Sequence, residues 1–445
     1  MIHAFFMRLK QKQQKLELIA PAGNLEKMKT AFAFGADAVY LGIADFSLRT
    51  RINDFTITKI KLALAYARKI NRKVYVTVNV FAHNKQIAKL PAHIRKLREI
   101  GVDGLFISDP GVLQIIKKHW PKAKIILSTQ ANCTNWQAAK FWQKQGVSRV
   151  ILARELTIKE IAAIHKKVPG LELECFVHGA MCMAYSGRCF LSKFFTDRNA
   201  NLGDCVQPCR WPYLAPSPSP ILGEGDNGFY IKAKDYHTPL ELVEEQHGSY
   251  ILNAQDLCLI KKLDELAKAG VSAFKIEGRA KSVYYLATVV GAYRKAIDLM
   301  AGKTEHAKRN RELGYLYKEL TEKLYHRGYS EGFMFGQGPL AQNLAESHEQ
   351  CGWEFCGQVI KSKKLKVKSK KYVNYIKVHN SLKVGDRVEI VEPFYDIIKM
   401  KIKRMMDSET GEEVKQAHGG QGRLVLIDSS REISQYSVIR RQAGG

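Results

Sequence analysis

The fold is decided by the stretch LELIAPAGNLEKMKTAFAFGADAVYLG (16–42), which reads as strand, helix and strand in succession. LELIAPA (16–22) and AVYLG (38–42) are short and almost continuously apolar, which is typical of parallel strands buried on both faces. Between them, NLEKMKTAFAFGA has a helical pattern and closes on glycine before the second strand. A parallel βαβ unit is therefore predicted at the start of the fold.

The same alternation of strand and helix continues along the chain. Further strands are predicted at KVYVTVNV (73–80), GLFIS (104–108), KIILST (124–129), RVILARE (149–155), LELECFVH (171–178) and AFKIEGR (273–279). Eight strands with helices between them are the number that a (β/α)8 TIM-like barrel requires. A doubly wound open sheet is the alternative, but no G-x-G-x-x-G motif follows the first strand.

The pattern breaks between the seventh and eighth strands, and it changes again near residue 350. The predicted organisation is a basic leader (1–15), a barrel (16–300) with an insertion (180–272), a helical connection (301–349) and a β-rich domain (350–445). In the last of these, short runs of alternating residues are separated by turn residues. This pattern favours a small antiparallel β-barrel as a separate C-terminal domain.

Composition limits the classes of protein to which the chain can belong. Of its 445 residues, 46% are hydrophobic and 10% aromatic, which excludes a disordered chain. Lysine and arginine number 70 against 43 acidic residues, and the formal net charge of +27 favours a polyanionic partner such as RNA, DNA or an anionic membrane surface. The alternative explanation for this charge is an effect on solubility alone.

The cellular compartment is predicted from what the sequence lacks. No apolar run reaches 18 residues, so no membrane span is expected. The start, MIHAFFMRLKQKQQK, has no sufficient apolar region or cleavage site for a secretory signal. Nine cysteines, an odd number, fit reduced thiols. We therefore expect a cytoplasmic protein.

Four cysteines lie within 28 residues of the insertion, in CMAYSGRCFLSKFFTDRNANLGDCVQPC. They are Cys182, Cys189, Cys205 and Cys209, and Cys258 is a reserve candidate. In a reducing compartment, clustered thiols indicate metal ligands or redox groups rather than disulfides. Zinc and an iron–sulfur cluster both suit four thiolates, although neither pair has the C-x2-C spacing of zinc knuckles. The spacing alone leaves this choice open.

Polar side chains follow several of the predicted strands, at the ends that face the active site in a parallel barrel. They include Asn79, Asp109, Gln130, Arg154, Glu155, His178, Glu277 and Arg279, with Lys275 inside the eighth strand. A residue of this kind taken alone is more often a structural hydrogen-bonding residue than a catalytic one, but as a set on one predicted face they predict a site. The arginines suit carboxylates or phosphate, and the acidic residues suit ion pairing or proton transfer.

The C-terminal domain contains KSKKLKVKSKK (361–371), a run with seven lysines. They are Lys361, Lys363, Lys364, Lys366, Lys368, Lys370 and Lys371. Such a run either protects a sheet edge from aggregation or contacts an RNA backbone, and both interpretations stay open.

Signatures of hydrolytic enzymes are missing from the sequence. There is no H-E-x-x-H zinc motif, no G-x-S-x-G motif and no G-x-x-x-x-G-K-[ST] loop. Ser186, in AYSGR, has no base that the sequence makes visible. The residues therefore predict no recognisable protease machinery.

The segment ECFVHGAMCMAYSGRCFLS (174–192) resembles the signature of the collagenase-like peptidase family U-32. The likeness extends to residues 17–42, 199–213 and 253–282 and to the β-rich tail, so it covers nearly the whole chain. Within this family, the chain most resembles the members that hydroxylate tRNA.

The resemblance implies a hydroxylase that forms 5-hydroxyuridine at the wobble position of tRNA, in the anticodon region. It implies prephenate as the hydroxyl donor and a 4Fe–4S cluster as the cofactor, held by Cys182, Cys189, Cys205 and, as the weakest match, Cys209. We expect Arg154 and Arg279 to bind the two prephenate carboxylates, and His178 or Glu277 to transfer a proton. A true peptidase and a non-catalytic RNA-binding protein with structural zinc are the alternatives.

Overall fold

The computed structural model describes most of the barrel and of the C-terminal domain. The described residues are 16–43, 46–48, 54–182, 184–189, 191–210, 213–214, 229–233, 240–242, 254–302, 305–336, 351–365, 372–420 and 422–443. No helix within these ranges is long and apolar enough to cross a membrane.

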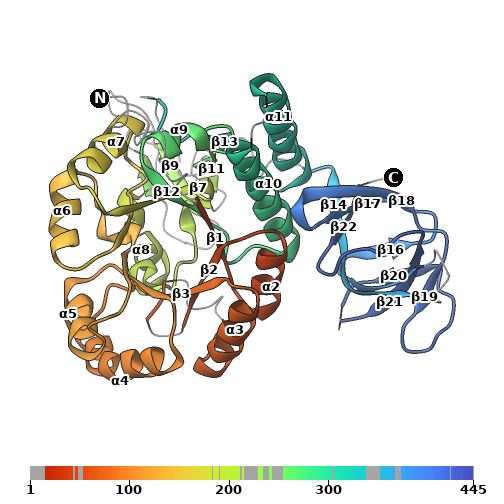
Figure 1. The fold of residues 1–445 in the computed structure, drawn as a ribbon, viewed down its shortest axis with the longest axis horizontal. Coiled ribbons are helices and arrows are strands. Elements are labelled where there is room, and N and C mark those ends of the chain that lie inside the picture. Colours follow the sequence, from red (N-terminus) through yellow and green to blue (C-terminus); the bar gives the residue numbers. More distant parts are fainter. Residues whose placement is uncertain are drawn as a thin grey trace, which may run out of the picture.

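Eight parallel strands close into a barrel, which confirms the predicted fold class (Figure 1). They are β1 (Glu17–Pro21), β2 (Ala38–Gly42), β3 (Lys73–Val78), β4 (Gly104–Ile107), β5 (Ile125–Leu127), β6 (Arg149–Ile151), β7 (Glu172–Gly179) and β12 (Val271–Ile276). Each strand pairs with the next along the chain, and β12 closes the barrel by pairing with both β7 and β1. The strands are almost entirely buried, as their apolar runs require.

Helices surround the barrel. They are α2 (Leu25–Ala33), α3 (Ile57–Lys69), α4 (Asn84–Ile100), α5 (Pro110–His119), α6 (Trp136–Lys144), α7 (Ile158–Lys167), α9 (Leu263–Lys268) and α10 (Val283–Ala301). Their ends follow local chemistry: the Asn24 side chain accepts a hydrogen bond from Lys27 N at 2.8 Å to start α2, and Gly101 ends α4 with a φ of 70°. These caps fix where α2 begins and where α4 ends.

The insertion lies between β7 and β12, as the sequence predicts. Its elements are α8 (Leu191–Thr196), β8 (Tyr213–Leu214), β9 (Phe229–Ala233), β10 (Leu240–Leu242) and β11 (Asp256–Cys258). β8, β9 and β10 pair as a small antiparallel sheet. β11 pairs antiparallel with the end of β7, and β13 (Tyr329–Ser330) adds to its other side. The insertion is therefore attached where the seventh barrel strand ends.

The C-terminal domain is an antiparallel β structure. Its strands are β14 (Trp353–Lys364), β15 (Tyr372–Val378), β16 (Ser381–Lys383), β17 (Arg387–Glu392), β18 (Asp396–Lys401), β19 (Met405–Asp407), β20 (Gln416–His418), β21 (Leu424–Ser429) and β22 (Val438–Gln442). Seven of them form one sheet in the order β18-β17-β22-β14-β15-β21-β19, and β16 pairs with β20. No pairing within the described residues joins β18 to β19, so the sheet has two edges there.

Helix α10 and helix α11 (His306–Lys323) stand between the barrel and the C-terminal sheet (Figure 1). α10 packs on α2 and is buried along most of its length. Arg440 of β22 is fully buried at this junction, and its guanidinium contacts the carboxylates of Glu319 and Glu389 at 2.5 and 2.8 Å. The contact ties the last strand of the chain to the helices that cover the barrel.

Candidate active site

A cavity of about 290 Å³ lies at the carboxyl ends of the barrel strands. Six of the polar residues predicted from the sequence line it: Asn79, Gln130, Arg154, Glu155, Glu277 and Arg279. They lie at or shortly after the ends of β3, β5, β6 and β12, so the closure of the barrel brings side chains from distant parts of the chain to one cavity. Lys275 and Cys182 line the same cavity.

Two arginines are held in the cavity wall by backbone carbonyls. Arg154 Nη1 donates to Ala180 O at 3.1 Å, and its guanidinium lies 4.2 Å from the centre of the Phe176 ring. Arg279 is buried, and its Nη2 donates to Leu48 O. Because a guanidinium has five N–H donors in a fork that matches a carboxylate, two arginines in one wall suit an anionic ligand.

Two buried polar atoms of the wall have no hydrogen-bond partner within the described part of the chain. They are Oε1 of Gln130, an acceptor, and Nε of Arg154, a donor. Buried polar groups are normally satisfied, so unsatisfied ones beside a cavity point to a bound molecule or to water. The wall therefore has one acceptor, Gln130 Oε1, and one donor, Arg154 Nε, that a polar ligand could bind.

Lys275 connects the cavity to an ion network inside the barrel. Its Nζ lies 3.1 Å from Glu174 Oε1 and 3.6 Å from the centre of the Phe106 ring. Burial lowers the pKa of Lys275 to about 8, although Glu174 opposes this change. The ammonium group is thus poised to lose its proton within an accessible pH range.

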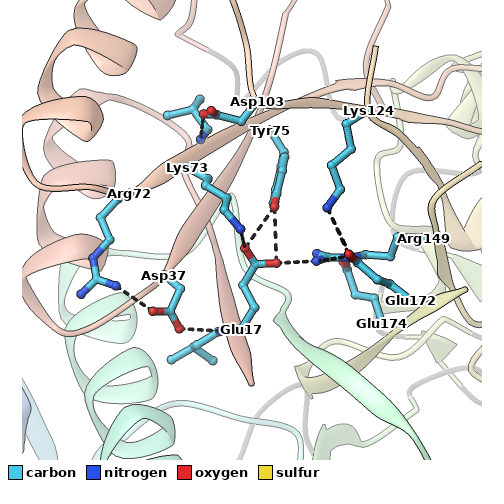
Figure 2. Close-up of polar contacts among 12 residues, drawn as sticks. Glu17, Asp37, Arg72, Lys73, Tyr75, Asp103, Lys124, Arg149, Glu172 and Glu174 are labelled. Carbon is cyan, nitrogen blue, oxygen red and sulfur yellow. Dashed lines mark hydrogen bonds and ion pairs between the residues drawn. The ribbon is translucent and has the colours of Figure 1, made fainter. Parts of the chain in front are cut away.

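The network beneath Lys275 is drawn in Figure 2 and closes the opposite end of the barrel. Arg149 Nη2 contacts Glu17 at 2.6 Å and Glu172 at 2.7 Å, and its Nη1 contacts Glu174 at 3.2 Å. Glu17 also accepts from Tyr75 Oη at 3.0 Å. Glu17, Arg149 and Glu172 stand at the amino ends of their strands, so the floor of the barrel is filled by paired charges.

Glu155 has a partner that the sequence does not reveal. One carboxylate oxygen accepts a hydrogen bond from the backbone N–H of Ser186, and the other lies 3.0 Å from Ser186 Oγ. Ser186 Oγ also lies 2.6 Å from Asn132 Oδ1. Because Ser186 and Glu155 are 31 residues apart, no local motif links them. The sequence places AYSGR (184–188) only a few residues after the seventh strand, which is the signal for a position near the site.

Two predicted catalytic residues do not line the cavity. His178 is buried at the end of β7, with its ring nitrogens 3.4 Å from the hydroxyls of Tyr293 and Tyr329. Burial lowers the pKa of His178 to about 3, so its ring is neutral. Asp109 is the N-cap of α5 and accepts a hydrogen bond from Val112 N at 2.9 Å. The structure thus gives both residues structural contacts.

The four clustered cysteines lie in the first part of the insertion. Cys182 and Cys205 are exposed, whereas Cys189 and Cys209 are partly buried. Burial raises the pKa of Cys189, and the thiols of Cys205 and Cys182 add to the rise, which places these three in one neighbourhood. As a thiol set they fit a thiolate-bound cluster or zinc. Within the described residues, however, no three ligating side chains are close enough to bind one metal ion.

Cys258, the reserve candidate, differs from these four. It lies in β11 and is buried, with Sγ 3.8 Å from the hydroxyl of Tyr293. Burial raises its pKa to about 11, so the thiol stays protonated at neutral pH. It pairs with the strand of His178 rather than facing the cavity. Cys209 is therefore the better candidate for a fourth ligand.

The predicted lysine run is only partly described. Lys361, Lys363 and Lys364 are exposed on β14, and the ammonium groups of Lys361 and Lys363 lie 4.0 and 5.7 Å from the centre of the Tyr375 ring. Lys366, Lys368, Lys370 and Lys371 lie outside the described residues. The described lysines thus form an exposed basic strand end beside an aromatic ring.

Comparison with known proteins agrees with the resemblance noted in the sequence. The chain is 37% identical to tRNA hydroxylation protein P of Escherichia coli, over 97% of this chain and 98% of that protein. It is 35% identical to the Haemophilus influenzae protein of the same name, over 96% of both chains. It is also 31% identical to 23S rRNA 5-hydroxycytidine C2501 synthase of E. coli, over 72% of this chain and 45% of that protein.

Family models cover both parts of the chain. The model described as peptidase family U32 matches residues 23–343, and that of the U32 C-terminal domain matches residues 352–440. These matches include the barrel from its first helix onward, the insertion with its cysteines and most of the antiparallel sheet. The chain belongs to peptidase family U32.

Proposed function

We propose that this protein is an RNA-modifying enzyme that hydroxylates C5 of uridine at the wobble position of tRNA. The observation that carries the proposal is the identity of 35–37%, over nearly the whole length, with relatives named tRNA hydroxylation protein P. The relative named as an rRNA 5-hydroxycytidine synthase matches 72% of this chain and is named for the same position of a pyrimidine ring. The net charge of +27 is suited to a polyanionic substrate.

The cavity supports a small anionic co-substrate. Replacing hydrogen by hydroxyl at C5 is a two-electron oxidation, so the hydroxyl donor must accept two electrons. We propose prephenate as this donor, with its two carboxylates bound by Arg154 and Arg279. Guanidinium groups bind carboxylates through paired N–H donors, and the unpartnered Nε of Arg154 is one such donor.

The cysteines support a redox cofactor at the mouth of the cavity. A 4Fe–4S cluster held by Cys182, Cys189, Cys205 and Cys209 would supply one-electron chemistry there. Cys182 is the member of the set that lines the cavity itself. The side chains of Gln130 and Asn79 then remain to orient the substrates, and Glu277 is the carboxylate proposed for proton transfer.

A paired or stacked base cannot reach a cavity at the end of a barrel. The target uridine must leave the anticodon stack, which is least costly in a single-stranded loop. The exposed lysines of β14 are proposed to contact the RNA backbone elsewhere. In this proposal, the lysines of β14 bind the RNA backbone, and the cavity carries out the reaction on one base.

The proposal is tested by nucleoside analysis of tRNA from a strain that lacks this protein. Any parallel oxygen-dependent route to the same nucleoside is removed first. We expect 5-hydroxyuridine and its derivatives to disappear, and to return when the wild-type protein is expressed. A Cys182→Ser variant expressed at the same level should not restore them. Unchanged modified nucleosides in the deletion strain would refute the proposed function.

Peptide hydrolysis is the second candidate, and one observation favours it. Ser186 Oγ lies 3.0 Å from Glu155 Oε2 in the cavity wall, which resembles a nucleophile beside a carboxylate base. However, Ser186 is buried, and its hydroxyl also contacts Asn132. Cleavage of gelatin by the purified protein, abolished in Ser186→Ala, would support a peptidase. Cleavage that persists in this variant would indicate a contaminating protease.

A further inference from the structure

Tyr185 is an aromatic side chain placed at the rim of the cavity. It lines the cavity and is nevertheless 59% exposed, so its ring belongs partly to the wall and partly to the outer surface. No hydrogen bond to its hydroxyl is found among the described residues. Large aromatic side chains are normally at least partly buried. An exposed aromatic ring at the mouth of a cavity therefore indicates a contact with a ligand.

The turn that carries Tyr185 is fixed in a costly conformation. Ser186, the next residue, has a φ of 46° and a ψ of 31°, which is the left-handed region that residues other than glycine and asparagine rarely adopt. The two carboxylate oxygens of Glu155 and the side chain of Asn132 hold it there. A strained backbone conformation persists only where surrounding contacts hold it in place, and such conformations are concentrated at functional sites.

A second anchor holds the other side of the turn. Arg188 Nε and Nη2 donate to Gln130 O at 3.2 and 3.1 Å, and Arg188 N donates to Tyr185 O at 3.0 Å. The Arg188 guanidinium is exposed and lies 5.4 Å from the centre of the Phe81 ring. The backbone around Tyr185 is thus fixed to the loops after β5 and β6, and a cation stands three residues away.

We propose that Tyr185 is a stacking platform for a nucleobase of single-stranded RNA, namely the base next to the one that enters the cavity. The proposal rests on the proposed function and adds to it the residue that receives the RNA loop. Every nucleobase has a π face, so an aromatic ring at the rim binds any neighbour of the target base. The adjacent Arg188 and the positive net charge favour RNA over a neutral peptide.

The first test measures binding of a fluorescein-labelled anticodon stem–loop RNA to the full-length protein. Tyr185→Ala should weaken binding about tenfold, whereas Tyr185→Phe should bind as the wild type does, because stacking needs the ring and not the hydroxyl. Tyr325→Ala is the matched control: Tyr325 is also 59% exposed but does not line the cavity, and this variant should bind normally. Equal affinities for the wild type and Tyr185→Ala would overturn the platform.

The second test detects stacking directly and does not depend on activity. A Tyr185→Trp variant should lose indole fluorescence when the stem–loop RNA is added, and a Tyr325→Trp variant should not. Quenching by gelatin peptides, but not by RNA, would overturn the inference in favour of a peptide. If the wild type hydroxylates the RNA but Tyr185→Trp is not quenched, the platform fails and the proposed function stands. If the wild type neither binds nor modifies RNA, the proposed function fails as well.

Discussion

At the scale of single residues, Glu155 makes contacts that its position after a strand does not reveal. Both of its carboxylate oxygens contact Ser186, so it holds a turn of the cavity wall. Ser282, by comparison, caps α10 through a neighbour only three residues away, which a sequence pattern can reveal. Glu277 is another carboxylate residue that the sequence predicts at this site, and it lines the same cavity.

The cysteines give the first prediction. Replacing Cys182, Cys189 or Cys205 singly by serine should abolish the iron content and the brown colour of protein purified anaerobically, because each removes one thiolate. Cys209→Ser should do the same, whereas Cys258→Ser should retain iron because its buried thiol faces Tyr293. Cys351→Ser is the control outside the insertion. Colourless wild-type protein with one zinc per chain would instead support a structural zinc site.

Lys275 gives a prediction about pH. Burial lowers its pKa to about 8, from the value of 10.5 that is ordinary for a lysine in water. Between about pH 8 and pH 10.5, Lys275 is protonated in the unfolded chain but has released its proton in the folded chain. The free energy of unfolding therefore rises with pH over this range. From about pH 7 to about pH 10, the wild type should gain about 1–3 kcal/mol relative to Lys275→Met in urea unfolding. Parallel pH profiles for the two proteins would contradict the lowered pKa.

At the scale of elements, the junction of β7 with β12 determines the shape of the site. Gly179, the last residue of β7, has a φ of 108°, and an added Cβ would lie 2.8 Å from the backbone oxygen of Glu277. The strand end that leads to the cysteines therefore touches the strand end that carries Glu277 and Arg279. Only a residue without a side chain allows this contact at this backbone conformation.

Gly179→Ala should consequently destabilise the protein by about 2–4 kcal/mol, from backbone strain and from the clash with Glu277. Urea unfolding monitored by circular dichroism measures this change. Gly314→Ala in α11 is the matched control, since no atom lies within 4 Å of its added Cβ. It should stabilise the helix by about 0.5–1 kcal/mol. Similar stabilities for the two variants would show that Gly179 is not constrained as described.

The elements were predictable to very different degrees. The eight barrel strands appear in the sequence because parallel strands buried on both faces must be apolar, as AVYLG (38–42) illustrates. The sequence predicts the C-terminal strands only as short alternating runs, and DIIKMK (396–401, β18) shows why: its residues are partly or fully exposed, so they need not be uniformly apolar. At the site, positions after strands indicated Arg154 and Arg279 correctly as cavity residues. The same reasoning also placed Asp109 at the cavity, but in the structure Asp109 caps α5 and does not line the cavity.

At the scale of the whole molecule, the barrel and the C-terminal sheet are joined by contacts that no local pattern reveals. Gln358 Nε2 donates to Thr30 Oγ1 at 3.0 Å, and Lys377 contacts Glu26 at 2.9 Å. These pairs join β14 and β15 to α2, across more than 300 residues of sequence. The C-terminal domain is thereby held against the barrel, so lysines on β14 have a defined position relative to the cavity.

Arg440, which is fully buried between Glu319 and Glu389, gives the last prediction. Arg440→Met should destabilise the protein by about 3–5 kcal/mol, because Glu319 and Glu389 would stay buried without this guanidinium. Differential scanning calorimetry should show a lower midpoint. Arg404→Met removes the exposed ion pair with Glu413 and should cost about 1 kcal/mol or less. If Arg440→Met unfolds at the temperature of the wild type, the buried pair does not hold the two domains together.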